Sequence, residues 1–173
     1  NTTTGEITKR LPGHKKGIQL VCFHPFDELL ISVDGENTVR MWDLATGKVK
    51  NQWTPDFGGV FDVAFSSDGK SLAIVGESKP VPQSAEAGGQ GSSLTGSVTI
   101  WNPETGTQTL EMSGHTARVN RAAFGPDGSQ LFTASDDRSV RSWSVADGIE
   151  LAKFSCDELV PIDIAVSDSV VGV

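Results

Sequence analysis

The chain of 173 residues repeats itself at a fixed interval. A similar turn recurs along the chain, each time with a glycine: Gly5, Gly47, Gly106 and Gly148. They are separated by 42, 59 and 42 residues, and matching phenylalanines and tryptophans show the same two intervals. A unit of 42 residues with one 17-residue insertion accounts for all of these spacings. Such a period, within about 40–45 residues, is typical of proteins built from repeated small sheets.

Each unit contains four short runs that predict β-strands, separated by turns rich in Gly, Asp, Pro and Ser. The units span residues 18–53, 60–112 and 119–155. A further fourth strand is predicted at residues 6–11, and the start of another unit at 161–173. No segment shows sustained helical periodicity. The sequence therefore predicts an all-β fold, a β-propeller of four-stranded antiparallel blades with three full blades and partial flanking blades.

Two of the units carry a more specific pattern. It consists of Gly13-His14 with Trp42-Asp43, and of Gly114-His115 with Trp143-Ser144. In both units the Trp follows the His by 28 residues. This pattern resembles the WD-repeat (tryptophan-aspartate repeat) β-propeller family, and the likeness covers essentially the whole chain. The second unit departs from it, because Pro55-Asp56 stand at the Gly-His place and Asn102 follows Trp101.

The resemblance implies a hydrogen-bond relay in each regular blade, running from the Trp indole to a hydroxyl, then to a His and then to a carboxylate. In the third unit the relay residues would be Trp143, Thr133, His115 and Asp137. In the first unit they would be Trp42, Ser32, His14 and Glu36, with Glu where Asp is usual. No relay is expected in the second unit. Hydroxyl, imidazole and carboxylate also make up a hydrolase triad, but a motif that recurs in successive blades describes the blade, so we assign no catalytic residue.

The resemblance also implies exposed positions beside the relay on one face of the blades. These positions are Lys15, Lys16, Asp34, Gly35, Thr116, Arg118, Asp136 and Arg138. Partner contact and an ordinary polar loop surface are both open interpretations of them. We expect a non-catalytic scaffold that presents these loops to other proteins or peptides. The alternative is a ligand-binding or catalytic propeller that uses the central channel.

Composition narrows the possible ligands. The net charge is −8, and residues 51–173 hold sixteen Asp and Glu against seven Lys and Arg, so no nucleic-acid partner is expected. Cys22 and His24 could share a strand face, but a zinc site needs about four ligands, and we expect no metal and no cofactor. No apolar stretch is long enough for direct insertion into a membrane. The basic residues around His14 are interpreted as a solvated loop, with an anion site as the alternative.

The extra residues of the second unit fall at about residues 77–95, between its second and third strands. They are rich in Pro, Gly and Ser and contain no aromatic residue, which predicts a flexible loop that folding does not require. A propeller closes with about four to eight blades. We therefore expect these residues to be an internal portion of a longer chain, with seven blades as the resemblance implies. The remaining blades would come from the same longer chain or from another subunit.

Overall fold

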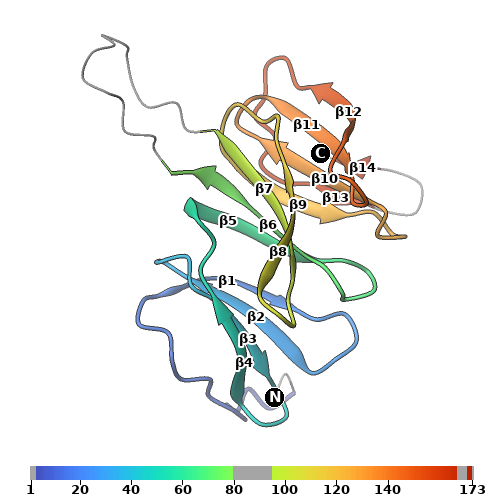
Figure 1. Ribbon diagram of the computed structural model, residues 1–173. Helices are drawn as coiled ribbons and strands as arrows, with labels where there is room; N and C mark the ends of the chain where they lie inside the picture. The colour runs from blue at the N-terminus through green and yellow to red at the C-terminus, as the bar shows by residue number, and fades with distance from the viewer. Residues whose placement is uncertain (1–2, 80–94, 167–170, 173) are drawn as a thin grey trace.

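The computed structural model describes residues 3–79, 95–166 and 171–172. Twelve strands form three four-stranded antiparallel sheets, called blades 1, 2 and 3, which follow one another along the molecule (Figure 1). The prediction of an all-β fold with three four-stranded antiparallel blades is confirmed. Within the described ranges no helix is long and apolar enough to cross a membrane.

The strands follow the predicted order. Blade 1 consists of β1 (Ile18–Phe23), β2 (Leu29–Asp34), β3 (Val39–Asp43) and β4 (Lys48–Trp53). Blade 2 consists of β5 (Phe57–Phe65), β6 (Leu72–Ser78), β7 (Gly96–Asn102) and β8 (Thr107–Met112). Blade 3 consists of β9 (Val119–Phe124), β10 (Gln130–Ser135), β11 (Ser139–Ser144) and β12 (Glu150–Ser155). A short additional sheet pairs β13 (Ala165–Val166) with β14 (Val171–Gly172).

The repeated glycines explain part of the periodicity. Gly47, Gly106 and Gly148 lie in the turns that join the third and fourth strands of the three blades. Their φ angles are 73°, 66° and 76°, in the left-handed region where a side chain is disfavoured. One backbone requirement, met once in each blade, therefore places a glycine at a fixed point of every unit.

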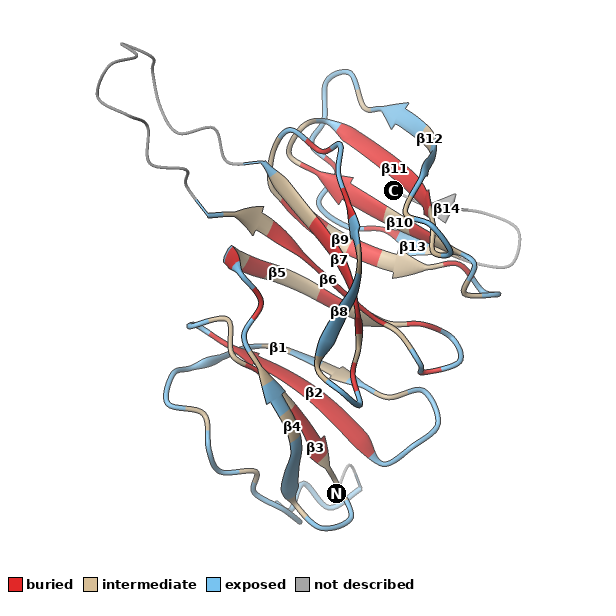
Figure 2. Cartoon of the chain, in the orientation of Figure 1, coloured by how far each residue is buried: buried red, intermediate tan, exposed pale blue. Residues whose placement is uncertain are grey.

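Neighbouring blades pack through apolar faces. The first strands of the blades, β1, β5 and β9, adjoin one another in succession (Figure 1). Figure 2 shows that the buried residues concentrate on the middle strands of each blade. Between blades 1 and 2 the core includes Ile31, Val39, Met41, Val63, Leu72 and Ile74. Between blades 2 and 3 it includes Val75, Val98, Ile100, Met112, Val119 and Leu131. Each blade therefore buries one face against the next.

Two sequence-based strand predictions at the ends of the chain are wrong in extent. Residues 6–11 form no strand. The fourth strand of a complete blade pairs with the third strand beside it, and the described chain gives residues 6–11 no such neighbour; Lys9 instead donates to the carbonyl oxygens of Leu44 and Ala45. The strand predicted from residue 161 begins only at Ala165. Pro161 has no N–H to donate to a strand ladder, which is consistent with the later start.

The predicted insertion loop lies mostly outside the described residues, but the hairpin that bears it is described. Strands β6 and β7 pair as far as Glu77 and Gly96, and Ser78 N donates to Thr95 O at 2.8 Å. A pair of facing residues joined in this way can be connected by a two-residue hairpin turn. We expect replacement of residues 79–94 by Asn-Gly to change the melting temperature by no more than about 2 °C, which corresponds to about 0.5 kcal/mol. Loss of cooperative unfolding by circular dichroism would show that the loop is needed for folding.

Candidate functional site

The relay predicted for the third unit consists of side chains that the structure brings together. Trp143 Nε1 donates to Thr133 Oγ1 at 2.8 Å. Thr133 Oγ1 lies 2.7 Å from His115 Nε2, and His115 Nδ1 lies 2.8 Å from Asp137 Oδ2. Strands β10 and β11 hold the hydroxyl and the indole, and the loops at one end of the blade supply the imidazole and the carboxylate. The result is one continuous chain of polar contacts inside a sheet.

The direction of these hydrogen bonds follows from the chemistry of the groups. An ionised carboxylate only accepts, so His115 Nδ1 carries the proton and donates to Asp137. His115 Nε2 then accepts from the Thr133 hydroxyl, whose oxygen accepts from the Trp143 indole. Burial lowers the pKa of His115 and outweighs the attraction of Asp137, which favours the neutral imidazole. Every polar atom of the relay therefore has a partner.

In blade 1 the carboxylate of the relay comes from Asp34, and the prediction of Glu36 is wrong. Trp42 Nε1 donates to Ser32 Oγ at 2.7 Å, and Ser32 Oγ lies 2.6 Å from His14 Nε2. His14 Nδ1 lies 2.8 Å from Asp34 Oδ2. Glu36 is exposed and lies 3.4 Å from Lys16 instead. Asp34 is only 2% exposed, so its assignment to the partner surface is also wrong.

The exchange of carboxylates has a local cause at the end of β2. In blade 3, Ser135 Oγ accepts from the N–H of Asp137, and Asp137 Oδ1 accepts from the N–H of Ser139. Asp34 stands where blade 3 has Ser135, and its Oδ1 accepts from the N–H groups of both Glu36 and Thr38. One carboxylate thus replaces a serine and an aspartate. Asp followed by Gly, with its tendency to accept hydrogen bonds from its own turn, was the sequence signal for this arrangement.

Blade 2 satisfies its tryptophan without a histidine. Ile74 stands at the place of the relay hydroxyl, and Trp101 Nε1 donates to Thr99 Oγ1 of its own strand at 2.8 Å. Thr99 Oγ1 in turn donates to the Ile74 carbonyl at 3.2 Å. Asp56, at the place of the histidine, has a side chain that is 89% exposed and forms an ion pair with Lys79. Among the described residues of blade 2, the indole is therefore the only relay group retained.

The relays differ from a hydrolase triad in the state of the hydroxyl. Thr133 is fully buried and Ser32 is 1% exposed. Each oxygen accepts a tryptophan N–H and shares its own proton with a histidine nitrogen, so neither hydroxyl is directed at an open site. A nucleophile must reach its substrate beside donors that stabilise the developing negative charge. The arrangement suits a packing element inside a blade.

The loops at the relay end of the blades form one surface, here called the His-loop face and defined by residues 12–17, 35–38, 113–118 and 136–138. The predicted contact residues that the structure exposes on it are Lys15, Lys16, Gly35, Thr116 and Arg138. Arg138 has a φ angle of 61°, which is uncommon for arginine. Asn37, at the same place in blade 1, has a φ angle of 60°, which asparagine adopts more readily. Of the other predicted contact residues, Asp34 is buried, and Arg118 and Asp136 are half-buried.

Arg118 joins blade 2 to blade 3 on this face. Its Nη2 lies 3.0 Å from Asp136 Oδ2, and its guanidinium carbon lies 4.7 Å from the ring centre of Phe61. Asn120 Nδ2 also donates to Asp136, at 2.7 Å. A guanidinium that is stacked and ion-paired has few orientations open to it. Arg118 therefore contributes to the rigidity of the surface as well as to its charge.

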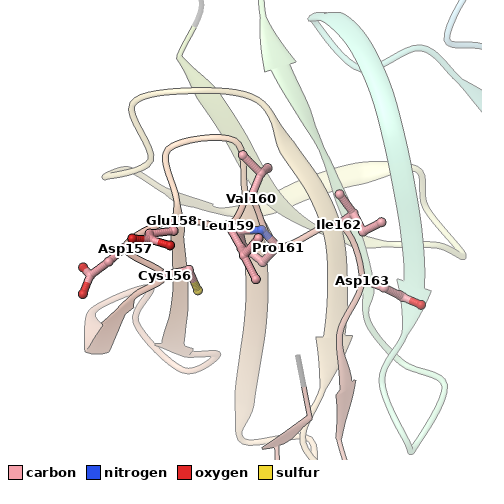
Figure 3. Close-up of a pocket in the computed structure, with 8 residues that line it drawn as sticks. All are labelled: Cys156, Asp157, Glu158, Leu159, Val160, Pro161, Ile162 and Asp163. Carbon is pink, nitrogen blue, oxygen red and sulfur yellow. The ribbon is translucent and has the colours of Figure 1, made fainter.

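Described residues line one hollow beside blade 3 and another beside blade 2. One, of about 600 Å³, is lined by the segment from Cys156 to Asp163 beside blade 3 (Figure 3). It lies next to the face of blade 3 that corresponds to the faces buried between the other blades, so its shape is that of a blade contact rather than of a ligand site. The other, of about 360 Å³, opens on the His-loop face between blade 2 and the loop into blade 3.

The residues considered for metal or channel chemistry lie apart. No group of three or more His, Cys, Asp or Glu side chains in the described ranges is arranged to hold a metal ion. His24 Nδ1 accepts from the N–H of Asp27 at 2.9 Å, and His24 Nε2 lies 3.2 Å from Gly69 O of blade 2. Val60 and Val119, in the first strands of blades 2 and 3, are 4% and 0% exposed because they pack between blades.

Two stretches of the chain match a known repeat family. A family model described as "WD domain, G-beta repeat" matches residues 5–43 and 106–144. The chain carries WD repeats. The two matches contain the first three strands of blades 1 and 3, and they leave out residues 44–105, which include the first three strands of blade 2.

Several WD-repeat proteins are similar in sequence. Nuclear distribution protein PAC1 of Arthroderma benhamiae is 29% identical over 152 residues, covering 84% of this chain and 33% of PAC1. A guanine nucleotide-binding protein subunit beta of Oryza sativa subsp. japonica is 28% identical over 151 residues, covering 86% of this chain and 37% of that protein. The chain therefore spans about a third of the length of these relatives.

A solved structure supports the fold. The crystal structure of the RRP9 WD40 repeats matches with a TM-score of 0.70 and 24% identity, covering 90% of this chain and 43% of that one. Together with the three antiparallel blades, this likeness confirms the predicted β-propeller architecture.

Acid is expected to weaken the fold through the blade 3 relay. Burial raises the pKa of Asp137, but hydrogen bonds from Ser139 and His115 outweigh it and lower the pKa to about 2. His115 and Asp137 both have lowered pKa values in the folded state, so the unfolded chain binds more protons as the pH falls. Stability should decline below about pH 6.5 through His115, and again between about pH 3.8 and 2 through Asp137.

Urea unfolding midpoints measured from pH 7.5 to pH 2 would check this dependence. The variant His115→Ala should lose the part of the slope that begins below about pH 6.5, because its unfolded state no longer gains that proton. An identical slope in the variant and the unmodified protein would contradict the assignment of the neutral imidazole.

Proposed function

We propose that this chain is a non-catalytic interaction module whose WD-repeat blades present the His-loop face to other proteins or peptides. The observation that carries the proposal is the enclosure of both Ser/Thr-His-Asp relays. Their hydroxyls are buried and are held by tryptophan indoles, which supports a structural role for groups that would otherwise suggest hydrolysis. Beside them, the same loops carry exposed charged side chains on a framework fixed by the blades.

The His-loop face carries exposed charges of both signs. Lys15 and Arg138 are exposed, and the side chain of Lys16 is 56% exposed beside Glu36. Arginine can anchor a contact through several hydrogen bonds at once. Charged loops of both signs on one rigid face favour recognition of a partner with a complementary pattern of charge.

The proposal can be tested by affinity capture from a cell extract, with the bound proteins identified by mass spectrometry. The double variant Lys15→Ala/Arg138→Asn removes two charges from the His-loop face, and the asparagine suits the backbone at residue 138. The matched control Lys48→Ala/Lys70→Asn removes two exposed charges outside that face, one at the start of β4 and one in the turn before β6. We expect the first variant to lose a partner that the unmodified chain and the control both retain. Equal retention by all three proteins would contradict the proposal.

A further inference from the structure

The cavity of about 360 Å³ on the His-loop face has a distinct chemical character. Ser97, Ser113 and Thr116 contribute hydroxyls to it, and Glu111 contributes a carboxylate. Ser78 and Thr95 also line it, and their hydroxyls are hydrogen-bonded to each other. The remaining lining residues are Gly96, Gly114 and the buried Met112 and His115. Strands of blade 2 form one side of the cavity, and the loop that leads into blade 3 forms the other.

The polar groups of this cavity have hydrogen-bonding capacity to spare. Within the described ranges, the side chains of Ser97, Glu111, Ser113 and Thr116 make no hydrogen bond or ion pair. In blade 1 the residue at the place of Glu111 is Gln52, which accepts from Arg40 Nε at 2.9 Å across the strand pair. In blade 2 the residue opposite Glu111 is Thr99. The third strand of blade 1 therefore places a cation beside the fourth strand, whereas the third strand of blade 2 places no cation opposite the Glu111 carboxylate.

These groups define the ligand. The cavity offers one negative charge and several oxygen acceptors, and no Lys or Arg lines it among the described residues. His115 adds no charge, since its pKa is lowered by burial and both ring nitrogens are already paired. A cation with several N–H donors is the ligand that matches the carboxylate and the hydroxyl oxygens of the cavity. An ammonium group can point three donors at scattered oxygens, whereas a guanidinium requires a planar arrangement of acceptors.

The lining also suits an alkyl stem. Met112, which is 2% exposed, also lines the cavity, and an unbranched thioether side chain adapts to apolar groups packed against it. Lysine side chains commonly lay their methylene groups along apolar surface while the charge meets polar groups. We propose that this cavity binds a lysine side chain of a protein partner, a proposal that rests on the interaction function of the His-loop face and names the chemistry of one contact.

The test uses the whole ¹⁵N-labelled chain and three small probes at low salt. The probes are the acetylated methylamides of lysine, of norleucine, which is its uncharged counterpart, and of arginine. We expect the lysine probe to shift the amide signals of Ser97, Glu111, Ser113 and Thr116 in a saturable manner. The norleucine probe should leave them in place, and the arginine probe should bind more weakly than lysine. Added salt should reduce lysine binding, because the contact is partly exposed.

Two variants connect the binding to the cavity. Glu111→Gln should weaken lysine binding by about two- to fivefold, the range expected for an exposed ion pair. Glu28→Gln is the matched control, since it removes one exposed carboxylate from blade 1 and should leave binding unchanged. If the spectrum shows that Glu111→Gln does not fold, Thr116→Val takes its place, with the same expected direction.

Three results would overturn the proposal: equal shifts with norleucine, stronger binding of arginine, or undiminished lysine binding in the cavity variants. Shifts confined to other parts of the molecule would do the same. Failure here is distinguishable from failure of the proposed function. The capture experiment with Lys15→Ala/Arg138→Asn changes residues outside this cavity, and it could still show a partner on the His-loop face.

Discussion

Replacing His115 by alanine is expected to lower the free energy of unfolding by about 1–3 kcal/mol. The imidazole links the Thr133 hydroxyl to the Asp137 carboxylate, and His115 is only 3% exposed. Alanine would leave the hydroxyl proton without its acceptor and would remove one of the donors to the Asp137 carboxylate, inside a part of the blade that water scarcely enters. Urea denaturation of the purified variant at neutral pH would measure the loss.

Blade 2 provides the matched control for this substitution. Asp56 stands at the place of His115, but its side chain is exposed and belongs to no relay. Asp56→Ala should therefore change the free energy of unfolding by no more than about 0.5 kcal/mol. An unchanged unfolding midpoint in His115→Ala, together with loss of a measured activity, would instead assign the relay a chemical role.

The positions of the blades could be predicted from the sequence because each repeated residue answers a local requirement. Gly47, Gly106 and Gly148 meet the need for a positive φ angle at one turn. Trp42 and Trp143 recur because each fills the same space in its blade, being 1% exposed in both cases. A requirement repeated at a fixed interval is visible without coordinates, whatever residues lie between.

The details that the spacing missed depend on contacts between segments. Glu36 has the correct distance in sequence from His14, but Asp34 meets the imidazole because its short side chain also caps the turn after β2. Thr99 was absent from the predicted site because its partner, the indole of Trp101, lies two residues further along the same strand. Residues 6–11 have the residue pattern of a fourth strand but form no strand. A strand forms only beside a neighbouring strand, and the residue pattern of one segment does not show whether that neighbour is present.

We expect the 173-residue chain, studied alone, to form species heavier than its 18.3 kDa monomer. The reason is an apolar face of blade 1 made of Ile18, Val21 and Phe23, which are 53%, 60% and 67% exposed. The residues at the places of Ile18 and Val21 are 4% and 6% exposed in blade 2 and 0% and 7% exposed in blade 3. All four of them pack against a preceding blade. Burying each such side chain stabilises a contact by about 1.5–3 kcal/mol.

Light scattering coupled to size-exclusion chromatography would measure the mass, and paired variants would locate the contact. Val21→Lys/Phe23→Lys places two charges on the apolar face of blade 1 and should shift the mass toward the monomer. Phe26→Lys is the control, since Phe26 is 75% exposed but lies in the turn after β1 rather than on the strand, and it should leave the association unchanged. A monodisperse 18.3 kDa species that unfolds cooperatively would contradict the prediction, because it would show that the exposed face of blade 1 is stable in water without another blade against it.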